Sequence, residues 1–272
     1  MKNKLLTLLI FSFCIYVFGQ NAKQDSITDQ YLKNGVYQHH YLSQEWRDYI
    51  DQAIEKDSTV ALFWQLKALP LWKTGKYGAA LNAYDKAVKL NPEQYLGRRG
   101  FLKCIFKKDY ESAITDLTNA EKQFGYAYEN DHSYRFYIAL SQLQLNQFQD
   151  AETTLKNDVQ KRLMKNGEDH IHFMDYFYLG VISYELKKYG EAIVYFDKAL
   201  NFYTHFSDAK YYKGLCLLKL NQPENGKKLM LEAKNDFENG YSFTEDDANY
   251  ERYPYQVNWF MAKWTIPGYA DK

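Results

Sequence analysis

The clearest pattern of apolar and polar positions lies in residues 173–200, FMDYFYLGVISYELKKYGEAIVYFDKAL. In its second half the apolar residues fall at i, i+3, i+7 and i+10, which is one face of an α-helix: Tyr189, Ala192, Phe196 and Ala199. The first half carries a second set: Tyr176, Leu179, Gly180 and Tyr184. We expect Gly180 to face Ala192, because small residues let two helix backbones approach closely. The stretch therefore predicts two short amphipathic helices packed against each other.

The pattern of the second helix recurs along the chain. Its first aromatic position aligns, at separations of 33, 38, 41 and 34 residues, on Tyr77, Tyr110, Phe148, Tyr189 and, degenerately, Pro223. A small residue follows three positions later, at Ala80, Ala113, Ala151, Ala192 and Gly226. Seven positions further on, the aligned residues are Ala87, Ala120, Asp158, Ala199 and Ala233. One register thus predicts five helical pairs over residues 61–240, with Asp158 alone out of type.

A period near 34 residues, with an aromatic residue, Leu-Gly, Tyr, Ala, Phe and Ala at fixed offsets, resembles the tetratricopeptide repeat (TPR). The resemblance implies an all-α fold, a right-handed superhelical solenoid of stacked helix-turn-helix repeats, and a role as a recognition scaffold. The next strongest match runs from Leu62 to Pro92 and ends at Asn91-Pro92, which stops the helix. Pro70 departs from the pattern and should kink the first helix or shorten its start.

Residues 20–60 are expected to hold a degenerate first repeat, so the repeat count is five or six. Stepping back 34 residues from Ala80 and Ala87 lands on Trp46 and Ala53, which predicts a helix over residues 43–58. Its partner would span residues 29–41, although Asn34-Gly35 stands where a helix former is wanted. Two polar insertions, residues 126–131 and 165–170, are predicted to be loops between repeats.

Residues 241–272 form a tail beyond the repeats. Thr244 is the expected cap of a helix that starts with three acidic residues, Glu245, Asp246 and Asp247. A short amphipathic helix is expected from the spacing of Val257, Phe260, Met261 and Trp264. The tail is predicted to cap the last repeat, whose apolar face would otherwise be exposed. Alternatively, aromatic residues of the tail fold back as part of a binding surface: Tyr250, Tyr253, Tyr255 and Trp259.

The N-terminus resembles a signal peptide over residues 1–19. Lys2 and Lys4 precede an apolar run from Leu5 to Phe18, which is short of the ~20 residues of a spanning helix. We predict cleavage between Gly19 and Gln20, export to the periplasm or medium, and no stable membrane span afterwards. A lipoprotein anchored at Cys14 is disfavoured by the bulky Phe13.

Cys104 and Cys216 remain after cleavage. They stand in repeats three units apart, too far for the ~7 Å between Cα atoms that a disulfide requires, so we expect two buried free thiols.

Composition and motifs exclude several classes of protein. Lys plus Arg equals Asp plus Glu, 34 against 34 in 272 residues, so no global field favours nucleic acid. The 26 Tyr, 17 Phe and 5 Trp are expected mainly in the core. No GxSxG, HExxH, CxxC, P-loop or GxGxxG appears, so we predict no enzyme and no cofactor.

The sequence predicts no metal site. The densest group of potential ligands is Glu168, Asp169, His170 and His172, but its spacing nominates no third ligand from a rigid element. A solvated loop is the expected structure there. The acidic residues 245–247 lack the alternating ligands and the central Gly of a calcium loop.

The resemblance also implies a binding surface on the first helices of the repeats. Some TPR proteins hold the acidic C-terminus of a partner with a basic residue and an Asn one turn apart, and this clamp is missing here. The corresponding positions are instead Gln65 and Leu69, Phe136 and Leu140, Phe177 and Val181, and Tyr211 and Leu215. The expected concave groove is lined by Leu69, Trp72, Phe136, Leu140, Phe177, Tyr184, Tyr211 and Leu215, with Arg98 or Arg99 as its basic exception.

These features predict an exported scaffold that binds a protein or peptide segment in an aromatic-lined groove, within an envelope assembly. One alternative is a structural subunit whose groove is filled by its own tail, with partners on the convex side. A third is a glycan-binding protein rich in aromatic residues. Trp259 and Trp264 discriminate, because packing on the last repeat indicates a cap and packing in the groove favours the structural subunit.

Overall fold

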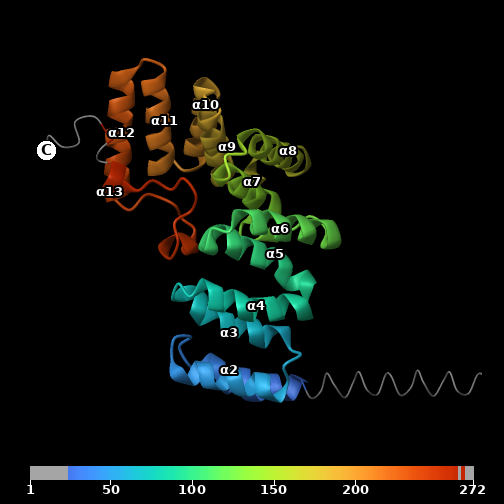
Figure 1. The fold of residues 1–272 in the computed structure, drawn as a ribbon. Coiled ribbons are helices and arrows are strands. Elements are labelled where there is room, and N and C mark those ends of the chain that lie inside the picture. The colour runs from blue at the N-terminus through green and yellow to red at the C-terminus, as the bar shows by residue number, and fades with distance from the viewer. Residues whose placement is uncertain (1–23, 263–264, 267–272) are drawn as a thin grey trace, which may run out of the picture. The chain divides into compact units, whose positions relative to one another are not determined.

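A computed structural model describes residues 24–262 and 265–266 (Figure 1). The predicted signal peptide, its cleavage site after Gly19, Cys14 and Trp264 lie outside these residues. Among the described residues the only strands are two of two residues each, and all other regular elements are helices. No described helix has both the length and the apolar character needed to cross a bilayer. The chain divides into two compact units, residues 1–95 and 96–272.

The N-terminal unit contains two helical pairs. The first consists of short turns, η1 (Thr28–Lys33) and η2 (Val36–Gln38), followed by α2 (Gln44–Lys56). The second pair is α3 (Ala61–Lys73) and α4 (Tyr77–Leu90). Helix α5 (Pro92–Leu102) begins in this unit, and the boundary falls within it. Ser43 caps α2 by accepting a hydrogen bond from the Trp46 amide at 3.1 Å, as its position before an amphipathic run requires.

Asn34-Gly35 ends η1 rather than lying within a long helix. A Cβ at Gly35 would lie 2.4 Å from the Tyr31 carbonyl oxygen and 2.6 Å from the Tyr49 ring. The glycine is therefore needed for the close approach of this turn to α2, which is why the expected helix over residues 29–41 is broken in two.

Pro70 does not shorten α3, which begins at Ala61 and continues through the proline to Lys73. A proline has no N–H, so the carbonyl of Leu66, four residues earlier, loses its helical donor. The indole Nε1 of Trp46 on α2 donates to that oxygen at 3.4 Å. A side chain from the preceding repeat thus compensates for the missing backbone hydrogen bond.

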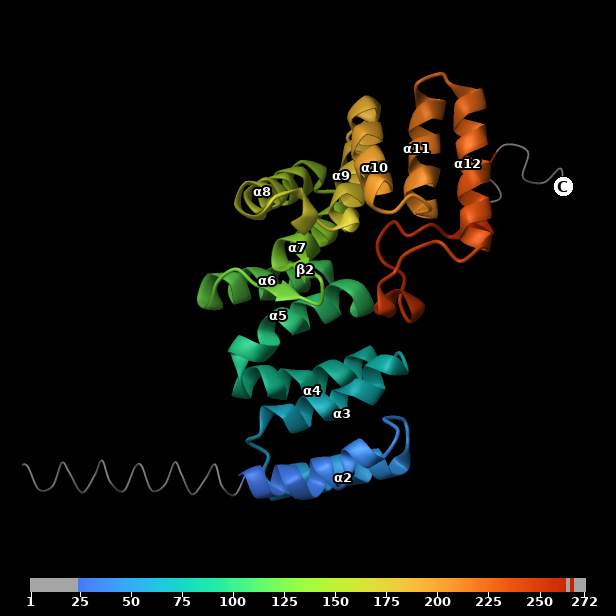
Figure 2. The same ribbon diagram turned by 180° about the vertical axis from the view of Figure 1, so that it is seen from behind.

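The C-terminal unit stacks four more helical pairs (Figures 1 and 2). The pairs are α5 with α6 (Tyr110–Phe124), α7 (Tyr134–Gln144) with α8 (Phe148–Asn166), α9 (Phe173–Glu185) with α10 (Tyr189–Phe202), and α11 (Ser207–Lys219) with α12 (Pro223–Glu238). Short elements complete the unit: η3 (Lys103–Lys107), β1 (Tyr128–Glu129), β2 (His132–Ser133), η4 (Glu168–His170), η5 (Asp246–Asn249) and α13 (Trp259–Ala262).

The turn inside each of five pairs uses the same backbone conformation. A residue with positive φ stands two positions before the first aromatic or proline of the second helix, at Gly75, Lys108, Asn146, Lys187 and Asn221. Their φ angles are between 59° and 72°. Only one is a glycine, so the left-handed turn is imposed by the pairing of the helices rather than by the residue type. The repeat register predicted from the sequence is the register of these turns.

The closest side chain to Gly180 in the central pair is Phe196. A Cβ at Gly180 would lie 2.5 Å from the ring of Phe196, one helical turn from Ala192 on α10. Ala192 is fully buried. The large ring fills the space that the missing side chain leaves, which explains why both residue types occur in this pair.

Asp158 is out of type in the register because it takes part in a buried ion pair. Its Oδ2 accepts from Arg162 Nε at 3.0 Å and from Ser133 Oγ at 2.8 Å. The same guanidinium donates twice to Asp175 on α9, at 2.7 and 2.9 Å. These paired contacts satisfy a charge in a position that the other repeats fill with alanine.

The two insertions are more regular than predicted. Residues 126–131 contain β1, which pairs antiparallel with β2 through Tyr128–Ser133 and Glu129–His132. The second insertion lengthens α8 to 19 residues before Gly167, with φ of 84°, ends it. Cys104 and Cys216 are both free and buried, as expected.

Two details of the tail were predicted wrongly. The short helix η5 begins after Glu245, not at a Thr244 cap. In α13 the buried residues are Trp259 and Ala262, whereas Phe260 and Met261 are 72% and 54% exposed. With a single turn of helix, contact with α11 and α12 decides which side is buried, and the apolar spacing does not.

Candidate partner-binding surfaces

The predicted groove residues of the C-terminal unit form one aromatic face on α7, α9 and α11, which consists of Phe136, Leu140, Phe177, Tyr184, Tyr211 and Leu215. Phe136, Leu140 and Phe177 are fully buried, and Tyr211 is nearly so. Tyr184 and Leu215 are half-buried. Since other side chains of this chain cover most of the aromatic face, little of it is open to a partner in this structure.

The tail contacts part of the aromatic face, at Phe177 and Tyr211, and its red path runs back from α12 (Figures 1 and 2). The Phe243 ring lies 5.6 Å from that of Phe177 and 5.4 Å from that of Phe206. Further along, Tyr255 lies 6.1 Å from Tyr212. These contacts are the edge-on and tilted arrangements that aromatic rings prefer.

Hydrogen bonds fix the path of the tail. Tyr178 donates its hydroxyl hydrogen to the Pro254 carbonyl at 2.7 Å. The carboxylate of Asp208 on α11 accepts from the Val257 amide at 2.7 Å and from the Ser242 hydroxyl at 2.9 Å. Burial raises the pKa of Asp208 to about 6, although these hydrogen bonds act in the opposite direction. The tail is therefore held through its backbone as well as its rings.

Trp259 packs on the last repeat. Its ring lies 5.7 Å from that of Tyr211 on α11 and stacks at 5.0 Å on Phe237 of α12. By the criterion derived from the sequence, this residue is a cap. The tail thus combines features of two predicted roles, with Trp259 capping the stack and Phe243 packed on Phe177 of the aromatic face.

The predicted basic residues differ in their availability. Arg99 donates to Asp116 from two nitrogens, both at 2.7 Å. The Lys103 ammonium also lies 2.7 Å from the Asp116 carboxylate. Arg98 is exposed and pairs with Glu129 at 2.9 Å. Arg99 is therefore bound within the repeat, and Arg98 alone faces solvent.

The remaining two predicted residues lie in the N-terminal unit. Leu69 packs against the core of that unit, and Trp72 is buried with its ring 5.6 Å from Tyr77. Both contribute to packing between helices. The open surface of this unit lies elsewhere, on residues that the sequence did not nominate.

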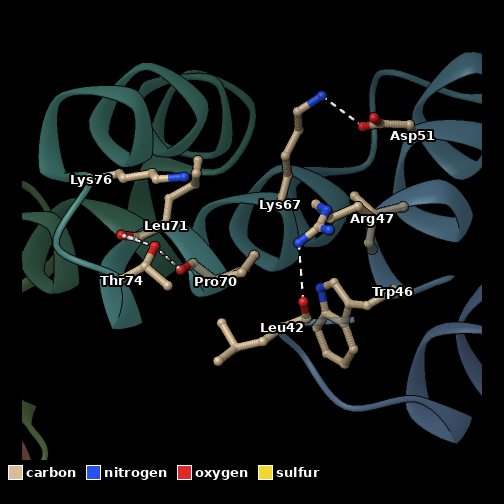
Figure 3. A pocket seen from close by; sticks show the side chains of 10 residues that line it. Leu42, Trp46, Arg47, Asp51, Lys67, Pro70, Leu71, Thr74 and Lys76 are labelled. Atoms are coloured by element: carbon tan, nitrogen blue, oxygen red, sulfur yellow. Dashed lines mark hydrogen bonds and ion pairs between the residues drawn. The ribbon is translucent and has the colours of Figure 1, made fainter. Parts of the chain in front are cut away.

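That open surface is a pocket of about 320 Å³ between α2, α3 and the start of α4 (Figure 3). Its apolar lining consists of Leu42, Trp46, Ile50, Pro70 and Leu71. Around these lie three basic residues and one acidic residue: Arg47, Lys67, Lys76 and Asp51. Two of its residues, Trp46 and Pro70, stand out in the sequence. There they indicate a repeat position and a departure from the helical pattern, and not a pocket.

Two of the pocket's cations already have partners. Lys67 pairs with Asp51 at 2.7 Å, and Arg47 donates to the Leu42 carbonyl at 3.1 Å and to the Gln44 side chain at 2.8 Å. Figure 3 shows the Lys67–Asp51 and Arg47–Leu42 interactions on one side of the pocket and Lys76 on the opposite side, beside Leu71. The exposed Lys76 leaves the lining with a net positive charge.

The four potential metal ligands of the second insertion, Glu168, Asp169, His170 and His172, do not form one group. Glu168, Asp169 and His170 are exposed. Glu168 accepts a hydrogen bond from the Tyr176 hydroxyl at 3.2 Å. His172 instead caps α9, where it meets His132 and Glu245.

Comparison with known proteins supports the repeat assignment. The tetratricopeptide repeat family model matches residues 61–94, which span α3 and α4. No curated protein matches this chain.

Several solved structures share the fold. PilW, a widely conserved type IV pilus biogenesis factor, aligns with a TM-score of 0.58 and 13% identity over 84% of this chain and 96% of its own. The pilF protein of Pseudomonas aeruginosa aligns with a TM-score of 0.58 and 18% identity, over 80% of this chain and 93% of its own. YrrB, described as a TPR protein with an unusual peptide-binding site, aligns with 0.50 and 20% over 69% and 91%.

At these identities the likeness establishes the fold alone. The fold, the matched repeat and the recurring turn together confirm the all-α TPR solenoid expected from the sequence. This chain has the fold of a tetratricopeptide repeat solenoid, and its residues 61–94 match the tetratricopeptide repeat family.

Proposed function

We propose that this protein is an exported scaffold that binds a segment of a partner protein in the pocket of its N-terminal unit. The observation that carries the proposal is the difference between the two surfaces. The aromatic face is mostly buried by this chain's own side chains, with the tail packed on Phe177 and Tyr211, whereas the pocket at Leu42 and Leu71 is open. The fold shared with YrrB, described as having a peptide-binding site, and with the pilus biogenesis factor PilW supports a role in protein interaction rather than catalysis. Export and an envelope assembly rest on the N-terminal sequence.

The chemistry of the pocket indicates the kind of segment it takes. An apolar side chain would be buried against Trp46, Ile50 and Leu71, which is favourable by about 25 cal/mol per Å² of apolar surface. The excess of basic residues around the rim favours an acidic residue beside that side chain. The partner segment is therefore apolar with a flanking carboxylate.

The test begins with site-specific photo-crosslinking in the native cell. Leu42 at the pocket and Leu90 at the end of α4 are leucines of similar exposure, 42% and 40%, in the same unit. A crosslinking side chain at position 42 should capture the partner, and one at position 90 should not. Equal capture from both positions would remove the pocket as the binding site.

The captured segment is then titrated against variants. Leu71→Ala should weaken binding about tenfold, because burial of a leucine is worth at least about 1.4 kcal/mol. Lys76→Ala should weaken it less, and by an amount that falls as salt is added. Leu90→Ala is the matched control and should bind like the wild type. Unchanged affinity in both pocket variants would contradict the proposal.

A second candidate keeps the predicted groove as the binding site. The tail lies on the aromatic face much as a bound peptide would, through rings and backbone hydrogen bonds. A partner segment that displaced the tail would meet Phe177 and Tyr211. The assignment of the groove residues to partner binding therefore stays a prediction.

A further inference from the structure

Three potential metal ligands from distant parts of the chain meet in the C-terminal unit. His132 lies on β2, His172 caps α9, and Glu245 precedes η5 in the tail. One ligand atom from each lies within 4.8 Å of the other two. The sequence separations are 40 and 73 residues, so no spacing motif could reveal the group.

The distances fit a tetrahedral ion. His132 Nε2 lies 3.3 Å from Glu245 Oε1. Ligand atoms bound to zinc at about 2.0–2.2 Å in a tetrahedron are separated by roughly 3.4 Å. The His132–Glu245 pair already has that separation, and the His172 ligand atom, within 4.8 Å of the other two, needs to approach them by up to about 1.4 Å.

Buried polar atoms at the same place have no protein partner. His132 is 2% exposed, and its Nδ1 makes no hydrogen bond within the described part of the chain. The same is true of the buried Glu245 Oε2. Buried polar groups almost always have a partner, and a bound ion or water is a common one when the protein supplies none. An ion beside His132 Nε2 and Glu245 Oε1 would give Glu245 Oε2 the partner it lacks, whereas His132 Nδ1 points away from that position.

The surroundings hold the ligands in place. The His132 ring stacks on Phe136 at 4.0 Å and meets His172 edge-on at 4.8 Å.

We propose that His132, His172 and Glu245 bind a divalent transition-metal ion of the zinc type, with water in the fourth position. Two imidazoles and a carboxylate are a known ligand set for zinc. Binding has one identifiable cost. The Met174 amide donates to His172 Nδ1 at 3.3 Å, and neutral imidazole has a single lone pair, so coordination replaces this long hydrogen bond. The ion would tie the tail, through Glu245, to β2 and α9.

The test uses the full chain after treatment with a chelator. Titration with zinc should show one ion per chain, and cobalt should give the visible absorption of a tetrahedral site. Glu245→Gln and His172→Gln should each lower the affinity at least about 100-fold, since even outer-shell changes cost 10- to 100-fold. His170→Gln is the control, because His170 is exposed and two residues from His172. Absence of binding, or equal binding by all variants, would overturn the proposal.

A second measurement needs no variant. Zinc should slow amide hydrogen exchange in residues 242–249 of the wild-type protein, because the ion fixes Glu245 to two other elements. Unchanged exchange at saturating zinc would show that the ion binds elsewhere.

Discussion

Asp208 illustrates how one residue joins the tail to the repeats. Its carboxylate is fully buried and accepts hydrogen bonds from three groups, the Val257 amide and the hydroxyls of Ser207 and Ser242. Burial raises its pKa to about 6 from the ordinary 3.8. A carboxylate in this position orders the tail but binds a proton more readily in the folded protein than in the unfolded chain.

This raised pKa predicts a pH dependence of stability. Because the folded state binds the proton more tightly, the contribution of Asp208 is fully present below about pH 3.8 and is lost as the pH rises through about 6. The free energy of unfolding of the wild type, relative to Asp208→Asn, should therefore increase between pH 7 and pH 4. The increase should be up to about 3 kcal/mol.

Urea unfolding of both proteins at several pH values measures this difference. Asp208→Asn is a close match in size and keeps an oxygen for the Val257 amide, so it is expected to fold. A difference that does not change with pH would mean that the carboxyl group titrates normally in the folded protein.

The helical pair is the element on which this fold is built. Five of the pairs turn through a left-handed residue two positions before the second helix, and these pairs bury small residues where the helices meet. In α9 the contact depends on the missing side chain of Gly180, which leaves room for the Phe196 ring. Gly190, at the start of α10, has no heavy atom within 4 Å of the position of an added Cβ.

These two glycines form a matched pair of substitutions. Gly180→Ala should destabilise the protein by about 1–3 kcal/mol, because the new methyl group overlaps a ring that is packed on all sides. Gly190→Ala should be neutral or stabilising by up to about 1 kcal/mol, because alanine favours the helix. In thermal melts, the melting temperature of Gly180→Ala should therefore fall by several degrees, and that of Gly190→Ala should stay the same or rise. Equal shifts would mean that the packing of the central pair differs from that described.

At the scale of the molecule, the tail determines which surfaces a partner can reach. It packs on Phe177 and Tyr211 of the aromatic face, and the Phe243 ring contacts both Phe177 and Phe206. The pocket of the N-terminal unit is lined by residues of that unit alone. The two candidate functions therefore respond differently to loosening of the tail.

Phe243→Ala separates the candidates. Binding in the pocket should be unchanged by this variant, whereas binding on the aromatic face should strengthen several-fold, because the partner no longer competes with a firmly held tail. On the aromatic face, Phe177→Ala should weaken binding about tenfold, as expected for a buried aromatic anchor. Titration of the captured partner gives both affinities. Phe260→Ala is the control, since Phe260 is 72% exposed and should leave either mode unaffected.

The repeats could be predicted from the sequence because each helical pair is stabilised by contacts between positions close along the chain. The spacing of Tyr77, Ala80 and Ala87, and its recurrence around Tyr189, reports which side of a helix is buried. Pro70 and Gly35 were identified as departures from that pattern. Their consequences depend on Trp46 and Tyr49, which belong to a neighbouring helix, and so only the structure could explain them.

The sequence by itself determined the all-α class, the repeat register and the two free cysteines, since all three follow from local periodicity and from separation along the stack. Tertiary structure alone decided where the tail lies, which surface stays open, and that His132 and Glu245, 113 residues apart, would meet. Contacts of that kind depend on the shape of the whole unit. Apolar spacing within a single helix carries no information about that shape, because it specifies that a side is buried and not what buries it.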